Sequence, residues 1–173
     1  MLQSEKVKAN QREVIELYHS CFPPEEKFPF DQLMNLSARR DVEFLAYYDH
    51  QMFVGFTFSI IGPQSVFVLY FAVNQKLRNK GYGSEILKLL KERYEKAINL
   101  NIEALDPSSS NINERLRRYV FYKKNGFMNT HYKLLLAHGE YAILSTPGFD
   151  MESYKKTIQI LDKQLPEIKY VLA

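Results

Sequence analysis

The sequence is poor in cysteine, since Cys21 is the only one among 173 residues. An internal disulfide is therefore excluded, and a zinc site built from cysteines is not expected. The four histidines, at positions 19, 50, 131 and 138, show no short metal-binding spacing, so we expect no metal site. A lone thiol, and a polar, charged N-terminal segment unlike a secretion signal, favour a reducing, cytoplasmic setting.

Strong charge imbalance and long apolar helices are also lacking. The net charge of +3 is too small to indicate nucleic-acid binding by itself. The segment Gln51–Val73 has no charged residue and is long enough to span a membrane, but Gly62-Pro63-Gln64-Ser65 interrupts it. Turn residues between two runs rich in Phe, Val and Ile predict a β-hairpin, so we expect no membrane segment.

No internal repeat or linker divides the chain, so we expect a single domain over residues 1–173. The patterning predicts a mixed α/β (α+β) domain with an antiparallel meander, a strand–helix–strand crossover and a final hairpin. Its expected helices cover 10–21, a short segment capped by Asp31, 83–97, 113–125 and 150–165. Its expected strands cover 42–48, 52–61, 65–73, 100–105, 127–137 and 141–145.

A loop with two glycines follows the strand at 65–73, which is apolar almost throughout and should be buried on both faces. Gly81 and Gly83 lie where the next helix begins. Because the first N–H groups of a helix have no internal partner, glycines there let the backbone approach a phosphate closely. A Walker loop is excluded because Gly83-Ser84 lacks the lysine, and a dinucleotide fingerprint because Ile86 stands where its third glycine would be.

Two motifs carry a resemblance to a known family. Arg78-Asn79-Lys80-Gly81-Tyr82-Gly83 fits R-x-x-G-x-G and resembles the acetyl-CoA loop of the GNAT superfamily of N-acetyltransferases. Phe121-Tyr122-Lys123-Lys124-Asn125-Gly126-Phe127 is similar to the F-Y-x-x-x-G-F segment of that superfamily. The resemblance covers roughly 42–145. It implies a GNAT-like fold, with a mostly antiparallel sheet, a central splayed parallel strand pair and helices on both faces.

The resemblance implies acetyl-CoA as cosubstrate and gives its contacts. Backbone N–H groups at Lys80, Gly81, Tyr82, Gly83 and Ser84 should hold the pyrophosphate, next to Arg78 and Asn79. The strand end at Phe71, Ala72 and Val73 should pair with the pantetheine arm, which fills the gap between the splayed strands. Lys76 adds a further positive charge beside the loop.

One position departs from the family pattern. Many members have an asparagine seven residues before the motif tyrosine, where it contacts the cofactor, and here that residue is Arg115. Asn111 and Asn113 lie nearby, and we take Asn113 as the substitute. The basic run Arg115, Arg117, Arg118, Lys123 and Lys124 is either a solvated helix face or a contact for the 3′-phosphate end of coenzyme A.

Acetyl transfer to an amine requires proton donors and acceptors. Tyr122 is the expected general acid, because a phenol of pKa about 10 can donate to a thiolate whose thiol has a pKa of about 8.5; otherwise it is a core aromatic. Glu103, in an otherwise apolar strand, is the expected general base; the alternative is a cross-strand ion pair with a lysine or arginine. Asp106, the Glu25-Glu26 pair and a bound water are further candidates for the base.

The sequence therefore predicts an N-acetyltransferase that moves an acetyl group from acetyl-CoA to a primary amine by direct attack. The alternative is a non-catalytic module that binds acyl-CoA as a sensor or partner-binding domain. The weak positive charge is the only feature that would indicate binding to nucleic acid, so we expect no nucleic-acid partner. The acceptor amine, on a small molecule or on a protein, is left open, and so is dimerisation through the terminal strands or helix.

Overall fold

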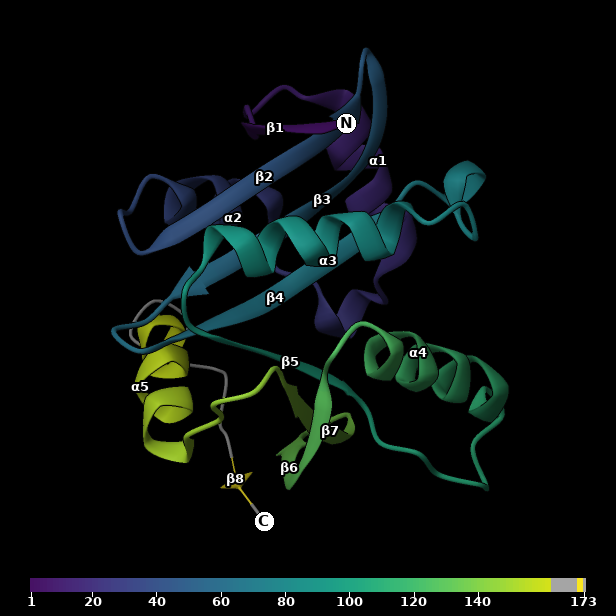
Figure 1. Ribbon diagram of the computed structural model, residues 1–173, viewed down its shortest axis with the longest axis vertical. Coiled ribbons are helices and arrows are strands. Elements are labelled where there is room, and N and C mark those ends of the chain that lie inside the picture. Colours follow the sequence, from purple (N-terminus) through teal and green to yellow (C-terminus); the bar gives the residue numbers. More distant parts are fainter. Residues whose placement is uncertain (163–170, 173) are drawn as a thin grey trace. The chain divides into compact units, whose positions relative to one another are not determined.

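The structure is a computed structural model that describes residues 1–162 and 171–172 (Figure 1). The helices are α1 (Arg12–Cys21), α2 (Phe30–Ser37), α3 (Tyr82–Arg93), α4 (Ile112–Lys124) and α5 (Met151–Asp162), with 3₁₀ turns η1 (Pro24–Glu26) and η2 (Gln75–Leu77). The strands are β1 (Leu2–Lys6), β2 (Val42–Asp49), β3 (Met52–Ile61), β4 (Ser65–Val73), β5 (Ala97–Glu103), β6 (Met128–Leu136), β7 (Gly139–Ser145) and β8 (Val171–Leu172).

The chain divides into two compact units. Unit 1 comprises Met1–Ile61 and Val68–Arg93, and unit 2 comprises Gly62–Phe67 and Tyr94–Ala173. Strand β4 begins in unit 2 and ends in unit 1. The expectation of a single domain over 1–173 stays a prediction.

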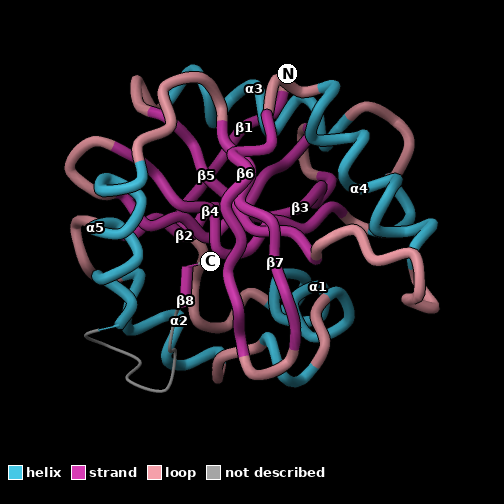
Figure 2. The backbone as a smooth tube through the Cα atoms, turned by 90° about the horizontal axis from the view of Figure 1, so that it is seen from below, coloured by secondary structure: helices cyan, strands magenta, loops and turns pink. Residues whose placement is uncertain are grey.

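Unit 1 is a meander with helices on both faces. Its strand order is β1-β2-β3-β4, and β1 with β2 and β2 with β3 pair antiparallel. Helix α3 lies on one face, and α1 and α2 lie on the other (Figures 1 and 2). Aromatic side chains fill the space under α1 and α2, with ring centroids of Phe44 and Phe58 5.1 Å apart. Such tilted and edge-on pairs add to the stability gained by burial.

Unit 2 holds the parallel pair of strands. Ser65–Phe67 of β4 pair in parallel with Ala97–Asn99 of β5, and the described register ends there, at three residue pairs. On its other side β5 pairs antiparallel with β7, β7 with β6, and β6 with β8. The expected fold class, a mostly antiparallel mixed sheet with one parallel pair, is confirmed.

A buried hydroxyl cluster fixes α5 to the start of β4 within unit 2. The Thr157 and Ser65 hydroxyl oxygens lie 2.7 Å apart, and the Thr157 hydroxyl donates to the Ser153 carbonyl at 2.8 Å. Gly62 gives the cluster room, because a Cβ there would lie 2.0 Å from Thr157 Oγ1. A buried polar group without a hydrogen-bond partner lowers the stability of the fold, so the cluster fixes the position of α5 against the start of β4.

Several boundaries differ from the sequence-based expectations. The expected helix over 83–97 ends at Arg93, because Ile98, Leu100 and Ile102 are buried at the period of two that strands require, and β5 begins at Ala97. Strand β1 was not expected, because it buries only Leu2 and so carries no alternating pattern.

The start of α2 also differs. The expected cap Asp31 lies inside α2, whose N-cap is Pro29. The expected residues 163–165 of the last helix lie outside the described residues. Within the described part of the chain, no helix is long and apolar enough to cross a membrane.

Replacing Thr157 with valine tests the hydroxyl cluster. Valine keeps the shape and removes a fully buried hydroxyl that serves Ser65 and Ser153. We expect the free energy of unfolding to fall by about 1–3 kcal/mol, because Ser65 loses a buried partner. Chemical denaturation of both proteins measures this, and an unchanged midpoint with unchanged slope would contradict it.

Candidate active site

The loop between β4 and α3 in unit 1 presents backbone N–H groups. Asn79 has φ of 61° and Gly81 has φ of 87°, both in the left-handed region. The first bond of α3 runs from the Glu85 N–H to the Gly81 carbonyl at 3.1 Å. The N–H groups of residues 82–84 precede that bond and form the positive end of the helix dipole.

The space around this backbone is open. Apart from Gly81 itself and its two chain neighbours, no described atom lies within 4 Å of the position that a Cβ on Gly81 would take. The side chains of Lys76, Arg78 and Lys80 are exposed around the loop. An accessible, left-handed turn at a helix start with three cations beside it fits a diphosphate group.

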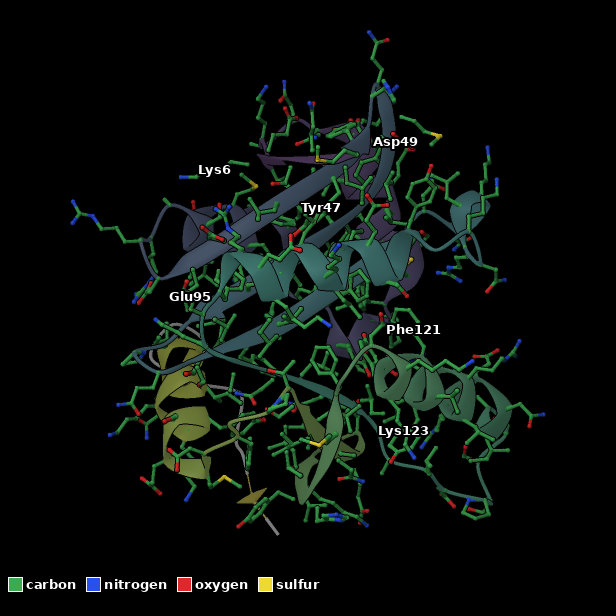
Figure 3. The ribbon with its side chains drawn as sticks, in the orientation of Figure 1. Lys6, Tyr47, Asp49, Glu95, Phe121 and Lys123 are labelled. Carbon is green, nitrogen blue, oxygen red and sulfur yellow. The ribbon has the colours of Figure 1, made fainter. Side chains whose placement is uncertain are left out.

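Both ends of the loop are fastened within unit 1. At its start the Asn74 side chain accepts from the Lys76 N–H at 3.2 Å and donates to the Phe53 carbonyl at 3.2 Å. At its end the Tyr82 hydroxyl donates at 2.8 Å to Oδ2 of Asp49, the last residue of β2, which is labelled in Figure 3. That bond, followed by one from His50, lowers the pKa of Asp49, and the same bond raises the pKa of Tyr82.

The end of β4 holds Phe71, Ala72 and Val73, the residues expected to meet the pantetheine arm. Ala72 is buried, and the other two are half-buried. Strand β3 approaches closely here, because a Cβ on Gly55 would lie 2.2 Å from the Ala72 carbonyl oxygen. Gly55 thus sets the position of the β4 backbone at these residues.

Tyr122, the expected general acid, lies on α4 in unit 2. Its ring packs against Phe121 and Phe127, at centroid distances of 5.2 and 5.6 Å. Gly126 ends the helix at φ of 86°, so the chain turns back and the Phe127 N–H donates to the Tyr122 carbonyl at 3.1 Å. Burial raises the pKa of Tyr122 to about 12, against a smaller lowering by Arg118. The phenol therefore keeps its proton at neutral pH.

Glu103, the expected general base, lies at the end of β5 and forms two ion pairs. Its Oε1 lies 3.3 Å from a guanidinium nitrogen of Arg115, and its Oε2 accepts from Arg118 at 3.1 Å. The ion-pair alternative is therefore present in the structure, with partners on helix α4 rather than across the sheet. Both carboxylate oxygens are engaged by cations.

Arg115, at the position of the family's asparagine, is tied into unit 2. Its guanidinium donates to the Ala104 carbonyl and to Asn111 Oδ1, each at 2.8 Å. Asn113, the expected substitute, is exposed in the first turn of α4, and its carbonyl accepts from Arg117 at 3.4 Å. The Asn113 side chain is thus accessible, whereas that of Asn111 already serves Arg115.

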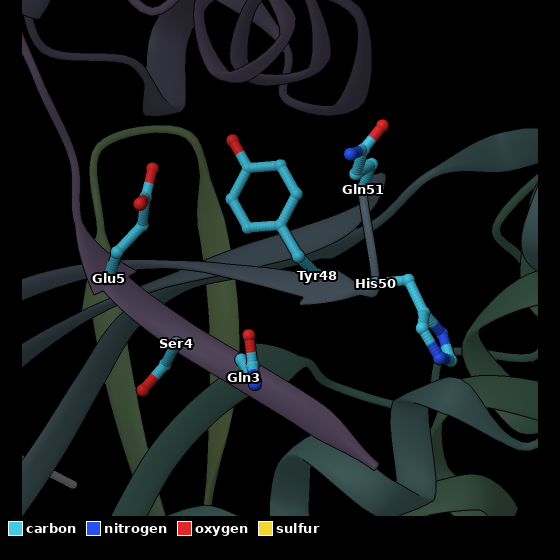
Figure 4. A pocket seen from close by; sticks show the side chains of 6 residues that line it. All are labelled: Gln3, Ser4, Glu5, Tyr48, His50 and Gln51. Atoms are coloured by element: carbon cyan, nitrogen blue, oxygen red, sulfur yellow. The ribbon is translucent and has the colours of Figure 1, made fainter.

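A pocket of about 340 Å³ lies elsewhere in unit 1, between β1 and the β2–β3 turn (Figure 4). Its lining is polar and consists of Gln3, Ser4, Glu5, Tyr48, His50 and Gln51. The Tyr48 hydroxyl donates to Glu13 at 2.8 Å, and desolvation, with Glu13 adding to it, raises the pKa of Tyr48 to about 12. None of the expected site residues lines this pocket, so the candidate site is the glycine loop.

Among residues 1–162 and 171–172, no three potential metal ligands lie together. Three supporting residues escaped the sequence reasoning, namely Asp49, Gly55 and Asn74. Asn74 had a local signal, because an asparagine directly after a strand often bonds to the backbone two residues on. Asp49 and Tyr82 lie 33 positions apart in the sequence, so no local pattern predicted the hydrogen bond between them.

Replacing Gly55 with alanine tests the close approach of β3 and β4. The new Cβ would collide with the Ala72 carbonyl, so one strand has to shift. We expect a loss of about 1–3 kcal/mol in the free energy of unfolding, as in other overpacked sites. Thermal unfolding measures it, and a variant as stable as the wild type would show that the strands are further apart.

The chain was compared with known proteins. A family model described as the acetyltransferase (GNAT) domain matches residues 40–129. Among solved structures, a GNAT-family protein from Bacteroides thetaiotaomicron is 22% identical at a TM-score of 0.76, covering 96% of this chain and 99% of that one. The comparison with curated proteins gives no match.

Two further structures share the fold. An aminoglycoside 6′-N-acetyltransferase complexed with coenzyme A is 16% identical at a TM-score of 0.64, covering 86% of this chain and 99% of that one. A GNAT-family acetyltransferase from Elizabethkingia anophelis with acetyl-CoA bound is 16% identical at a TM-score of 0.60, covering 84% and 97%. The family model spans more than half of the 173 residues and contains the glycine loop and Tyr122. The chain belongs to the GNAT family of acetyltransferases.

Proposed function

We propose that this protein transfers the acetyl group of acetyl-CoA to a primary amine. The observation that carries the proposal is the glycine loop, where left-handed Asn79 and Gly81 lead into the first N–H groups of α3. Two neighbours of the same fold hold coenzyme A or acetyl-CoA, which supports the same cosubstrate here. The direct test is the release of free thiol from acetyl-CoA across a panel of amines.

In this proposal the loop binds the pyrophosphate. The N–H groups at residues 80–84 donate to phosphate oxygens, with Arg78 and Asn79 beside them and the exposed cations adding favourable charge. Main-chain groups of Phe71, Ala72 and Val73 pair with the pantetheine arm. The exposed Asn113 side chain is proposed as a further cofactor contact in place of the family's asparagine.

Acetyl-CoA supplies an activated acetyl group, and the chain supplies orientation and proton handling. An N–H near Phe71 or Ala72 is proposed to face the carbonyl oxygen, where negative charge develops. The amine nitrogen forms the new bond to the carbonyl carbon, the bond to sulfur breaks with its electron pair, and one proton leaves the nitrogen. Tyr122 holds the proton that the departing sulfur requires.

The pKa of Tyr122 limits what it can do. A phenol of pKa about 12 lies more than three units above a free thiol, so full transfer to a solvated thiolate is uphill by roughly 5 kcal/mol. A buried thiolate is a stronger base, because desolvation raises its pKa as well. We therefore propose that Tyr122 first stabilises the sulfur by a hydrogen bond and transfers its proton only as the charge is buried.

Glu103 is our proposed general base. To accept a proton, Glu103 has to give up one of its two ion pairs. The side chain of Arg118 is 45% exposed and that of Arg115 is 19% exposed, so the ion pair with Arg118 is the easier one to break. Asp106 is a poorer candidate, because hydrogen bonds from the Ser108 hydroxyl and N–H lower its pKa. Glu25, Glu26 and a bound water are the remaining alternatives.

The acceptor is proposed as a primary amine of a small molecule or of a protein. The neighbour complexed with coenzyme A is named for aminoglycosides, which places small polyamine-like acceptors first in the panel. A cytoplasmic setting and a homodimer stay predictions.

A non-catalytic module that binds acyl-CoA is the second candidate. It is favoured by the burial of Tyr122 against Phe127, which a purely structural tyrosine would also show. Both candidates require the loop, so turnover separates them, because a non-catalytic module binds coenzyme A but releases no thiol from acetyl-CoA.

Replacing Tyr122 with phenylalanine keeps the ring packing and removes the proton donor. We expect kcat to fall about 100-fold or more, with coenzyme A affinity unchanged, because a general acid is lost. Tyr154→Phe is the matched control, since it also removes a buried hydroxyl in unit 2, one bonded to Asn101. Equal turnover of Tyr122→Phe and Tyr154→Phe would contradict Tyr122 as the general acid.

Replacing Gly81 with alanine tests the loop. Alanine at φ of 87° costs about 1–2 kcal/mol of stability, and its methyl group projects into the open space where phosphate is proposed to lie. We expect coenzyme A to bind at least tenfold more weakly by calorimetry. Gly148→Ala carries similar strain, at φ of 97°, outside the loop, and should bind coenzyme A normally. Equal affinities of the two variants would argue against the loop as the phosphate site.

A further inference from the structure

The side chain of Asn99, the third residue of β5, is buried in unit 2 with its hydrogen bonds unmade. Only 1% of Asn99 is exposed, and neither its Nδ2 nor its Oδ1 has a hydrogen-bond partner among the described residues. A buried amide in this state destabilises a fold, because its donor and its acceptor have both lost their contacts with solvent. A group from outside these residues is therefore needed to complete its hydrogen bonds.

Asn99 lies between two neighbouring strands, at the end of the parallel ladder. Phe67 of β4 faces it as the last residue of the described parallel register, and Ser145 of β7 is its antiparallel partner. Residues opposite each other in a sheet point to the same face, so these three side chains share one face. Helix α5 covers that face, because the rings of Tyr154 and Phe67 lie 6.0 Å apart and the Tyr154 hydroxyl donates to Asn101, two residues along β5.

The Ser145 hydroxyl is close enough to share a ligand with the Asn99 amide. In the adjacent pair of residues, the Thr146 N–H donates to the Ile98 carbonyl at 3.0 Å. Hydrogen-bonded and non-hydrogen-bonded pairs alternate along antiparallel strands, so Asn99 and Ser145 form a non-hydrogen-bonded pair, whose Cβ atoms lie roughly 4.5–5.5 Å apart. Ser145 is 1% exposed and its hydroxyl donates to the Thr146 carbonyl at 2.8 Å, so its oxygen can still accept a hydrogen bond.

The chemistry of these groups requires a ligand that both donates and accepts. The oxygens Asn99 Oδ1 and Ser145 Oγ take donors, whereas Asn99 Nδ2 takes an acceptor. A cation would leave Nδ2 without an acceptor, and an anion would leave both oxygens without donors. A water molecule serves all three atoms, since it donates twice and accepts from the amide, and buried waters typically make about three hydrogen bonds.

We propose that Asn99 and Ser145 bind a buried water molecule between β5, β7 and helix α5. The water completes the hydrogen bonds of the amide at the last described pair of the β4–β5 ladder, and it joins β5 to β7 through their side chains. Asn99 is then a water-binding residue in the interior of unit 2. The site requires no coenzyme A, so it stands or fails independently of the proposed function.

Nuclear magnetic resonance of the isotope-labelled wild-type protein tests the site directly. A water held beside the amide gives cross-peaks between the water signal and the two Asn99 side-chain amide protons, whose signals are identified by their loss in Asn99→Leu. Opposite signs of these cross-peaks in the laboratory-frame and rotating-frame experiments identify a bound water rather than proton exchange. We expect such cross-peaks, and a wild-type amide without them would overturn the proposal.

Replacing Ser145 with alanine tests the second ligand of the water. We expect the cross-peaks to weaken by about threefold or more, because the water loses one of its three hydrogen bonds and is held less firmly. Thr157→Val is the matched control, since it also removes a buried hydroxyl of unit 2, one that serves Ser65 instead. Its cross-peaks should equal those of the wild type. Cross-peaks that are as strong in Ser145→Ala as in Thr157→Val would contradict the proposed water site.

Discussion

The candidate site depends on how closely two backbones approach one another at Gly55. With no side chain there, β3 lies against the Ala72 carbonyl at a distance that any larger residue would forbid. Asn74, which directly follows β4, is bonded back to β3: its N–H donates to the Val54 carbonyl and its side chain to the Phe53 carbonyl. The start of the glycine loop is thus positioned by the β3–β4 pair.

The sequence predicted best those features whose signals are local. The hairpin around Gly62-Pro63, the strand Ser65–Val73 and the helix stop at Gly126 each depend on a few neighbouring residues, and each lies where it was expected. Strand β1 was missed because an exposed edge strand has one buried residue and no period. The helix after the loop was predicted to extend to Ala97, because the sequence pattern up to that residue is helical. In the structure Ala97 instead pairs with Ser65 in the sheet, and this tertiary contact outweighs the local helix propensity.

The loop motif predicted a glycine turn at a helix start, and Gly81 at positive φ directly before α3 agrees with it. Phosphate binding at this turn stays a prediction, and the contacts around the expected site residues were not predictable. The partners of Glu103 could not be predicted, because Arg115 and Arg118 reach it from an element more than ten residues away. The same holds for Tyr70, whose bonds to Glu26 and Phe28 connect residues more than forty positions apart.

The loop is fastened at its first residue by Asn74 and at its last by the bond from Tyr82 to Asp49. A binding loop held at both ends is preorganised, so little conformational entropy is lost when a ligand arrives. In the proposed function, affinity for the ligand then comes mainly from the backbone groups that touch it. Exchange among the exposed lysines at positions 76 and 80 should therefore be tolerated during evolution far better than any change at the two fastening points.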